Sequence, residues 1–167
     1  MAKTDGITQE YLRSILDYDM DTGIFRWKIS KPGISIGKIA GTLRQGYVAI
    51  TINRVQYLAH RLAWLYVTGD MPAQIDHKNV HGLRSDNRIC NLRPATQAQN
   101  SRNRGISRRN TTGYKGVYFE KSRNKFRASI RFDGVNIRLG RYSTAEEAHK
   151  AYCCVAEKLH GEFACFK

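Results

Sequence analysis

The sequence has few acidic residues, few prolines and no long apolar run. Its 167 residues contain 14 Asp and Glu against 28 Lys and Arg, a formal net charge of +14, with only three prolines. No segment approaches the roughly 20 apolar residues of a membrane helix, which excludes a transmembrane protein. The hydrophobic content of 41% excludes a largely disordered chain. Such an excess of positive charge favours a polyanionic partner, most often nucleic acid, with a solubilising surface charge as the alternative.

The four cysteines form no metal-binding pattern. Cys90, Cys153, Cys154 and Cys165 include no Cys-x-x-Cys pair, which argues against a zinc finger. Residues 1–5 lack the charged and apolar regions of a secretory signal. We therefore expect free thiols and a cytoplasmic protein.

The positive charge is concentrated in one quarter of the chain. Residues 101–141 carry 12 Lys and Arg with two acids, whereas residues 1–100 carry 13 with eight acids. The stretch 101–112 is polar, basic and without apolar periodicity, which predicts a linker between two folded units. Its basic flanks favour contact with a phosphate backbone over the alternative of a solvated tether.

Beyond the linker, the pattern predicts three antiparallel strands and one helix. Apolar and basic residues alternate over 125–132, a hairpin turn is expected at 133–134, and the alternation resumes over 136–139. An earlier strand is expected around 115–119. A helix that begins with a capping box at Thr144 then covers the apolar face. The basic face can enter a DNA major groove, and a charged solvent face is the alternative.

This region resembles the APETALA / ethylene-response-factor DNA-binding domain, through the motifs Gly113–Tyr118, Asn124–Arg131 and Leu139–Ala148. The resemblance covers about residues 113–166 and implies a three-stranded sheet that lies in the major groove, backed by one helix. The sheet lacks the tryptophans of the plant members, so the plant target sequence does not transfer. The DNA contacts implied by position are Lys115, Tyr118, Arg127, Ser129, Arg131, Asn136 and Arg138, and the basic linker adds Arg102, Arg104, Arg108 and Arg109.

The first hundred residues predict a second folded unit. Apolar spacing indicates a short amphipathic helix and, further on, a hairpin that leads directly into a second helix. The expected elements are a helix over 8–17, a strand over 23–27, a hairpin over 46–53 and 55–58, and a helix over 59–67.

The most informative stretch is Ile75-Asp76-His77, which predicts a strand end that presents a carboxylate beside an imidazole. Asn91 follows fourteen residues after His77, inside Cys90–Pro94, and Asn100 follows in an early turn of a helix. The order of strand, loop, strand and helix is expected to bring Asp76, His77 and Asn100 to one place. A neutral histidine can accept a proton from water near pH 7. One carboxylate and one amide oxygen suit Mg²⁺ or Mn²⁺, and the whole set suits hydrolysis of a phosphodiester.

This ordered set resembles the HNH endonuclease family, which folds as a ββα-metal motif. The resemblance spans about residues 7–103. Its motifs are Ala59–Trp64, Ile75–His77, Ser85–Arg88, Asn91–Arg93 and Gln99-Asn100.

The HNH resemblance implies a role for each residue of the set. His77 would be the general base, and Asp76 and Asn100 would be the metal ligands. Asn91 would brace the loop that orients His77, with Asn87 as its rival for that role. An asparagine at the last motif position occurs in the phage homing branch and favours an oxygen-rich site over zinc. His60 is a candidate phosphate contact, with packing or capping of its helix as an equal alternative.

Together, the two resemblances indicate an α+β protein that looks like a phage-encoded homing endonuclease. The expected domains are a nuclease over 1–101, a linker over 102–112 and a DNA-binding domain over 113–167. We expect a monomer that nicks or cuts double-stranded DNA without an obligate protein partner. The alternatives are a non-catalytic DNA-binding regulator, an RNA-directed or structure-specific nuclease, and an inactive nuclease kept for binding.

Overall fold

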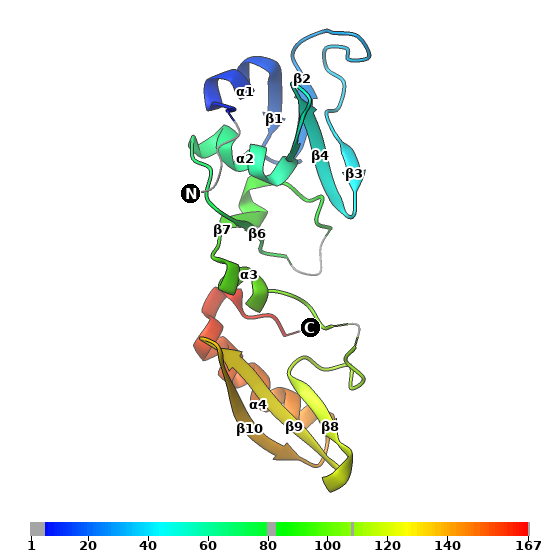
Figure 1. Cartoon of the computed structure of the whole chain (residues 1–167), viewed down its shortest axis with the longest axis vertical. Coiled ribbons are helices and arrows are strands. Elements are labelled where there is room, and N and C mark those ends of the chain that lie inside the picture. The colour runs from blue at the N-terminus through cyan, green and yellow to red at the C-terminus, as the bar shows by residue number, and fades with distance from the viewer. Residues whose placement is uncertain (1–5, 80–82, 108, 167) are drawn as a thin grey trace. The chain divides into compact units, whose positions relative to one another are not determined.

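The fold is α+β, and the chain divides into two compact units. The computed structural model describes residues 6–79, 83–107 and 109–166. Contacts separate Met1–Thr96, the N-terminal unit, from Gln97–Lys167, the C-terminal unit. Across the described ranges, no helix is long and apolar enough to cross a membrane. Figure 1 shows the order of the elements in both units.

The N-terminal unit combines helices with short antiparallel strands. The strands pair as β1-β2, β3-β4-β5 and β6-β7. The elements are α1 (Gln9–Ile15), β1 (Leu16–Asp19), β2 (Ile24–Trp27), β3 (Thr42–Arg44), β4 (Tyr47–Ile52), β5 (Val55–Leu58), α2 (Ala59–Thr68), β6 (Ile75–His77), the 3-10 turn η1 (Ile89–Asn91) and β7 (Leu92–Pro94).

One apolar core holds this unit together. Leu12 of α1, Phe25 of β2, Ile50 of β4 and Leu62 of α2 are each at most 2% exposed. Burying an apolar side chain of this size contributes roughly 1.5–3 kcal/mol. Ile75 of β6 belongs to the same cluster, so the core anchors the strand that carries Asp76 and His77.

The first helix is shorter than the sequence predicts. α1 ends at Ile15, and Leu16 is already extended, with φ −126° and ψ 146°. Leu16 pairs with Trp27 in the β1–β2 hairpin, and both side chains are buried. The tertiary pairing therefore overrides a helical pattern that could have continued. Strand β3 was not expected, because all three of its residues are exposed and show no apolar alternation.

The predicted hairpin and second helix are confirmed. β4 and β5 join through Asn53 and Arg54, with φ of 48° and 67°, the two positive values of a type I′ turn. β5 leads directly into α2, which ends at Gly69 with φ 76°. This connection places His60 in the first turn of α2.

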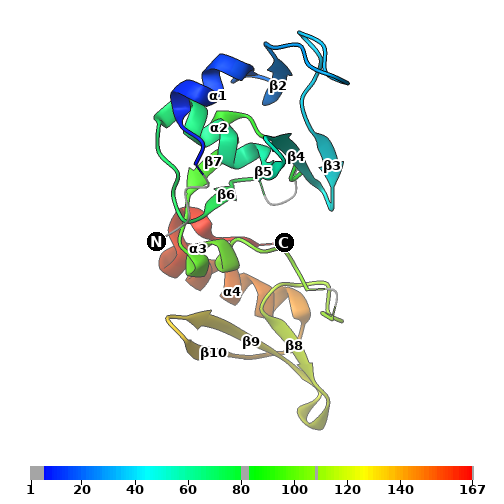
Figure 2. The ribbon, with the colours of Figure 1, turned by 45° about the horizontal axis from the view of Figure 1, so that its top comes forward.

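The C-terminal unit is a three-stranded antiparallel sheet backed by a helix, as predicted. The strand order is β10-β9-β8, and α4 runs along one face of the sheet in Figures 1 and 2. The elements are α3 (Gln97–Arg102), β8 (Val117–Glu120), the 3-10 turn η2 (Lys121–Arg123), β9 (Lys125–Phe132), β10 (Val135–Tyr142), α4 (Ala145–His160) and the 3-10 turn η3 (Gly161–Phe163).

Small side chains let α4 lie close to this sheet. Ala148 and Ala156 of α4 are fully buried, as is Ala128 of β9. The capping box of Thr144 and Glu147 is present at the start of the helix. The apolar side of the sheet is thereby covered, which leaves its basic side to face outward.

Candidate functional site

Strands β6 and β7 bring the central residues of the candidate active site together. β6 contains Ile75, Asp76 and His77, as the sequence predicts, and it pairs antiparallel with β7. Asp76 lies opposite Arg93, and His77 lies opposite Leu92. Because Ile75 and Leu92 are both in the core, the backbone that carries Asp76 and His77 is fixed by packing on both strands.

Asp76 forms a buried ion pair with Arg93. The Arg93 guanidinium donates to Oδ2 of Asp76 from Nε at 3.0 Å and from Nη2 at 2.8 Å. Asp76 is 5% exposed and Arg93 is 7% exposed. Sequence reasoning did not assign Arg93 to the site. The available signal was a single basic residue within a short apolar strand next to the strand that carries the aspartate.

His77 lies in a cluster of rings with His60 and Tyr47. The His60 and His77 ring centroids are 5.0 Å apart, and Tyr47 lies 5.6 Å from His60 and 6.1 Å from His77. The Arg84 guanidinium covers the Tyr47 ring at 5.3 Å. Tyr47 and Arg84 were not singled out from the sequence, because each comes from a segment without a recognisable motif.

Burial lowers the pKa of both histidines. Desolvation, with the charges of His77 and Arg61, lowers the pKa of His60 to about 3. The pKa of His77 is lowered mainly by desolvation, which the side chain of Asn87 and the carboxylates of Asp76 and Asp86 oppose. Both imidazoles are therefore neutral near pH 7. His60 is 6% exposed, a position that favours the packing alternative over the predicted phosphate contact.

Asn91 braces the connection between β6 and β7. Its Oδ1 accepts from the backbone N–H of Asn79 at 2.9 Å, and its Nδ2 donates to the carbonyl of Asp86 at 3.0 Å. Its own carbonyl accepts from the backbone N–H of Lys78 at 2.8 Å. Asn91 thus holds the backbone directly after His77.

Asn87 has a different place in the same connection. It is 2% exposed, and its backbone carbonyl accepts from the hydroxyl of Tyr18 at 2.6 Å. Its side chain influences the pKa of His77, so both asparagines act near the imidazole. Asn91 carries the hydrogen bonds across the connection, whereas Asn87 lies beside the ring. Residues 80–82 of this connection lie outside the described residues.

The two predicted metal ligands are both hard oxygen donors, and they belong to different units of the chain. Asp76 is a buried carboxylate in the N-terminal unit, and Asn100 is a half-buried amide on α3 in the C-terminal unit. Within the described part of the chain, no group of three or more His, Cys, Asp and Glu could hold a metal. Hard oxygen donors of this number suit Mg²⁺, which keeps several waters and also binds phosphate.

The basic face of the C-terminal sheet contains five of the predicted DNA contacts as accessible side chains. Tyr118 is 54% exposed, and the Arg127 guanidinium lies 5.8 Å from its ring. Arg131, Asn136 and Arg138 are exposed on β9 and β10. These residues form a polar, cationic surface opposite the face that α4 covers.

Two of the other predicted DNA contacts, Lys115 and Arg102, have partners within the unit. Lys115 precedes β8, and its Nζ donates to the backbone carbonyls of Arg102 and Arg104. Arg102 pairs with Asp133 at 2.8 Å. Ser129 is 7% exposed. Arg104 and Arg109 are exposed, and Arg108 lies outside the described residues.

Comparisons with known proteins agree with this arrangement. Residues 57–102 match the model of the HNH endonuclease family, and residues 112–162 match the model of the AP2 domain. The chain is similar to the uncharacterized HNH endonuclease L560 of Acanthamoeba polyphaga mimivirus, with 29% identity over 140 residues, or 84% of this chain. The match spans 65% of that curated relative, which is less than two thirds of its length. No solved structure matches the chain.

The chain therefore contains an HNH endonuclease domain followed by an AP2 DNA-binding domain. Both resemblances noted in the sequence are confirmed. An HNH endonuclease domain implies hydrolysis of phosphodiester bonds, and an AP2 domain implies binding to DNA.

Proposed function

We propose that this protein is a metal-dependent DNA endonuclease of the homing type, which nicks or cuts duplex DNA at a site chosen partly by the C-terminal sheet. The observation that carries the proposal is the Asp76–His77 pair on β6, held by Arg93 and by the hydrogen bonds of Asn91. In this proposal residues 1–101 cleave the phosphodiester bond. Residues 113–167 bind the DNA and fix the position of cleavage along it.

His77 acts as the general base. Its imidazole is neutral near pH 7 because burial lowers its pKa, so it can accept the proton of the attacking water. Asn91 holds the backbone on the C-terminal side of His77 and acts as a positioning residue. His60 and Tyr47 pack around the imidazole and limit its rotation.

Asp76 and Asn100 would hold a divalent ion, Mg²⁺ or Mn²⁺. The bound ion would neutralise charge on the scissile phosphate and stabilise the leaving oxygen. Arg93 keeps the Asp76 carboxylate in one orientation through two hydrogen bonds to Oδ2. A buried carboxylate oriented in this way is prepared for a ligand role before any ion arrives.

The C-terminal sheet binds the duplex. Arg127, Arg131 and Arg138 offer guanidinium groups on the uncovered face, where arginine can contact guanine edges or phosphates. One active centre per chain fits a monomer that nicks a single strand. Cleavage of both strands would need two binding events or a dimer.

The test compares the wild-type protein with His77→Ala on genomic DNA in Mg²⁺, with deep sequencing of the ends. The wild type should produce ends at a restricted set of sites, and the variant should produce none while it still binds the same DNA in EDTA. Unchanged cleavage by His77→Ala would remove His77 from the role of base. Binding by the wild type without cleavage in either Mg²⁺ or Mn²⁺ would instead support the non-catalytic regulator.

A further inference from the structure

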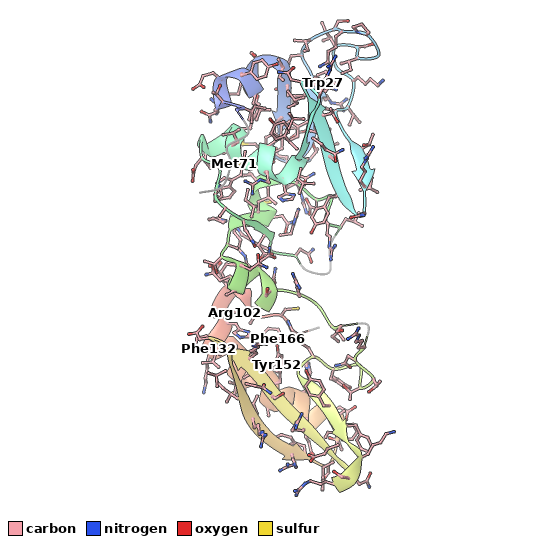
Figure 3. The ribbon with its side chains drawn as sticks, in the orientation of Figure 1. Trp27, Met71, Arg102, Phe132, Tyr152 and Phe166 are labelled. Carbon is pink, nitrogen blue, oxygen red and sulfur yellow. The ribbon has the colours of Figure 1, made fainter. Side chains whose placement is uncertain are left out.

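The segment between the two family matches is held against the C-terminal unit. Residues 101–107 and 109–110, here called the arm, begin in α3 and continue toward the first turn of the AP2 domain. Arg102 pairs with Asp133 at 2.8 Å, and its guanidinium lies 4.8 Å from the centre of the Phe132 ring. Figure 3 shows Arg102 and Phe132 next to each other. The predicted linker is thus attached to the β9–β10 turn at its start.

Further hydrogen bonds hold both ends of the arm. Nζ of Lys115 donates to the carbonyls of Arg102 and Arg104. At the far end, Nδ2 of Asn110 donates to the carbonyl of Tyr114, and its Oδ1 accepts from the backbone N–H of Gly113. The arm therefore forms a defined wall instead of a free tether.

A cavity of about 670 Å³ lies between the arm and one end of the sheet. Its lining combines residues of the arm with Tyr118 of β8, Ser129 and Arg131 of β9, and Tyr152 of α4. A cavity of this volume is in the range of small-ligand sites. Tyr118, Ser129 and Tyr152 add hydroxyl groups and aromatic rings to the basic side chains of the lining.

The charge of this cavity is strongly positive. Arg104, Arg109 and Arg131 line it, and within the described ranges none of these three forms an ion pair with a carboxylate. Asp133 is the acidic residue of the lining, and it is paired with Arg102. Lys115 also lines the cavity, and its Nζ donates to the neutral carbonyls of Arg102 and Arg104.

We propose that this cavity binds a backbone phosphate of the DNA, gripped between the arm and the sheet by Arg104, Arg109 and Arg131. The site continues onto the uncovered face of the sheet through Arg131 and Tyr118, which favours a phosphate of a bound strand over that of a free nucleotide. In this arrangement Arg102 and Lys115 hold the arm in place and do not contact DNA themselves. This inference rests on the proposed function and specifies how the DNA is held.

The experiment measures the salt dependence of duplex binding by the full chain in EDTA, between about 50 and 200 mM salt. Arg104→Gln and Arg131→Gln should each lower the slope of log K against log salt by roughly one, for any DNA sequence. Lys150→Gln is the matched control, because Lys150 is exposed on α4 and loses the same charge away from the cavity. Slopes equal to those of the wild type in both arginine variants would overturn the proposal.

Competition separates the two sources of phosphate. AMP and inorganic phosphate should fail to displace the duplex from the wild-type protein. If AMP displaces the duplex from the wild-type protein but not from Arg131→Gln, the cavity is a site for a free nucleotide, and the backbone proposal is overturned. Since these titrations measure binding without metal, their failure would leave the cleavage proposal standing, whereas absence of cleavage would leave the cavity proposal standing.

Discussion

Arg93 lies directly opposite Asp76 across β6 and β7, and it donates two hydrogen bonds to a single carboxylate oxygen. Both side chains are less than a tenth exposed. A buried ion pair of this kind contributes little when it is intact, because desolvation offsets the attraction. Removing one partner leaves an uncompensated buried charge, which is costly. The pair therefore fixes the geometry of Asp76 more than it stabilises the fold.

Arg93→Gln is expected to lower the free energy of unfolding by about 3–5 kcal/mol and to weaken binding of Mn²⁺ measured by calorimetry. The matched control is Arg88→Gln, because Arg88 pairs with Asp86 at 2.7 Å with 47% of its side chain exposed. The control should cost less than about 1 kcal/mol in urea unfolding. Equal small losses in both variants would show that the Asp76 carboxylate does not depend on Arg93.

Asn91→Ala should reduce cleavage without weakening DNA binding. The change removes the acceptor for Asn79 N–H and the donor to the carbonyl of Asp86, and the loss of such bonds costs roughly 1–3 kcal/mol in unfolding free energy. Asn91→Asp keeps the acceptor and loses only the donor, so its cleavage rate should be intermediate. Single-turnover rates and urea unfolding measure both effects. Full activity in Asn91→Ala would argue that Asn87 holds His77 instead.

The burial of His60 predicts that the free energy of unfolding decreases toward acidic pH. Burial lowers its pKa from the ordinary value of 6.5 to about 3, so the unfolded chain binds a proton more readily than the folded protein. The stabilising contribution is present above pH 6.5 and is lost as the pH falls toward 3. Between pH 7 and pH 5 this residue should account for about 2 kcal/mol of lost unfolding free energy.

The measurement compares urea unfolding of the wild type and His60→Gln at both pH values. The other histidines titrate in both proteins, so the difference between the two decreases reports on His60 together with its coupling to His77. The decrease should be smaller in the variant. Parallel pH profiles would mean that His60 is not buried as a neutral imidazole.

Gly116→Ala should disrupt the C-terminal unit. Gly116 has φ 75°, and an added Cβ would collide with the ring of Tyr152. Gly113→Ala is the matched control, because its φ is also 75° and nothing lies within 4 Å of an added Cβ. The control carries only the backbone strain of roughly 1–2 kcal/mol. Circular dichroism melts and duplex affinity should therefore both decrease much more for Gly116→Ala.

The sequence by itself determined the elements whose local chemistry is strong. The structure confirms several short-range signals. These are the turns at Asn53-Arg54 and Asp133-Gly134, the capping box at Thr144 and the alternation of β9. The order of Asp76, His77, Asn91 and Asn100 indicated the nuclease family before any geometry was known. These features depend on neighbouring residues, which the sequence displays directly.

Only the tertiary structure decided what lies opposite each of these residues. The partner of Asp76 is Arg93, seventeen positions away along the chain, and the neighbours of His77 include Tyr47 from a different sheet. Arg102 and Lys115 looked like free basic residues in the sequence, yet both hold the arm. Burial and ion pairing depend on long-range packing, so charge alone could not separate the residues that bind within the protein from those available to DNA.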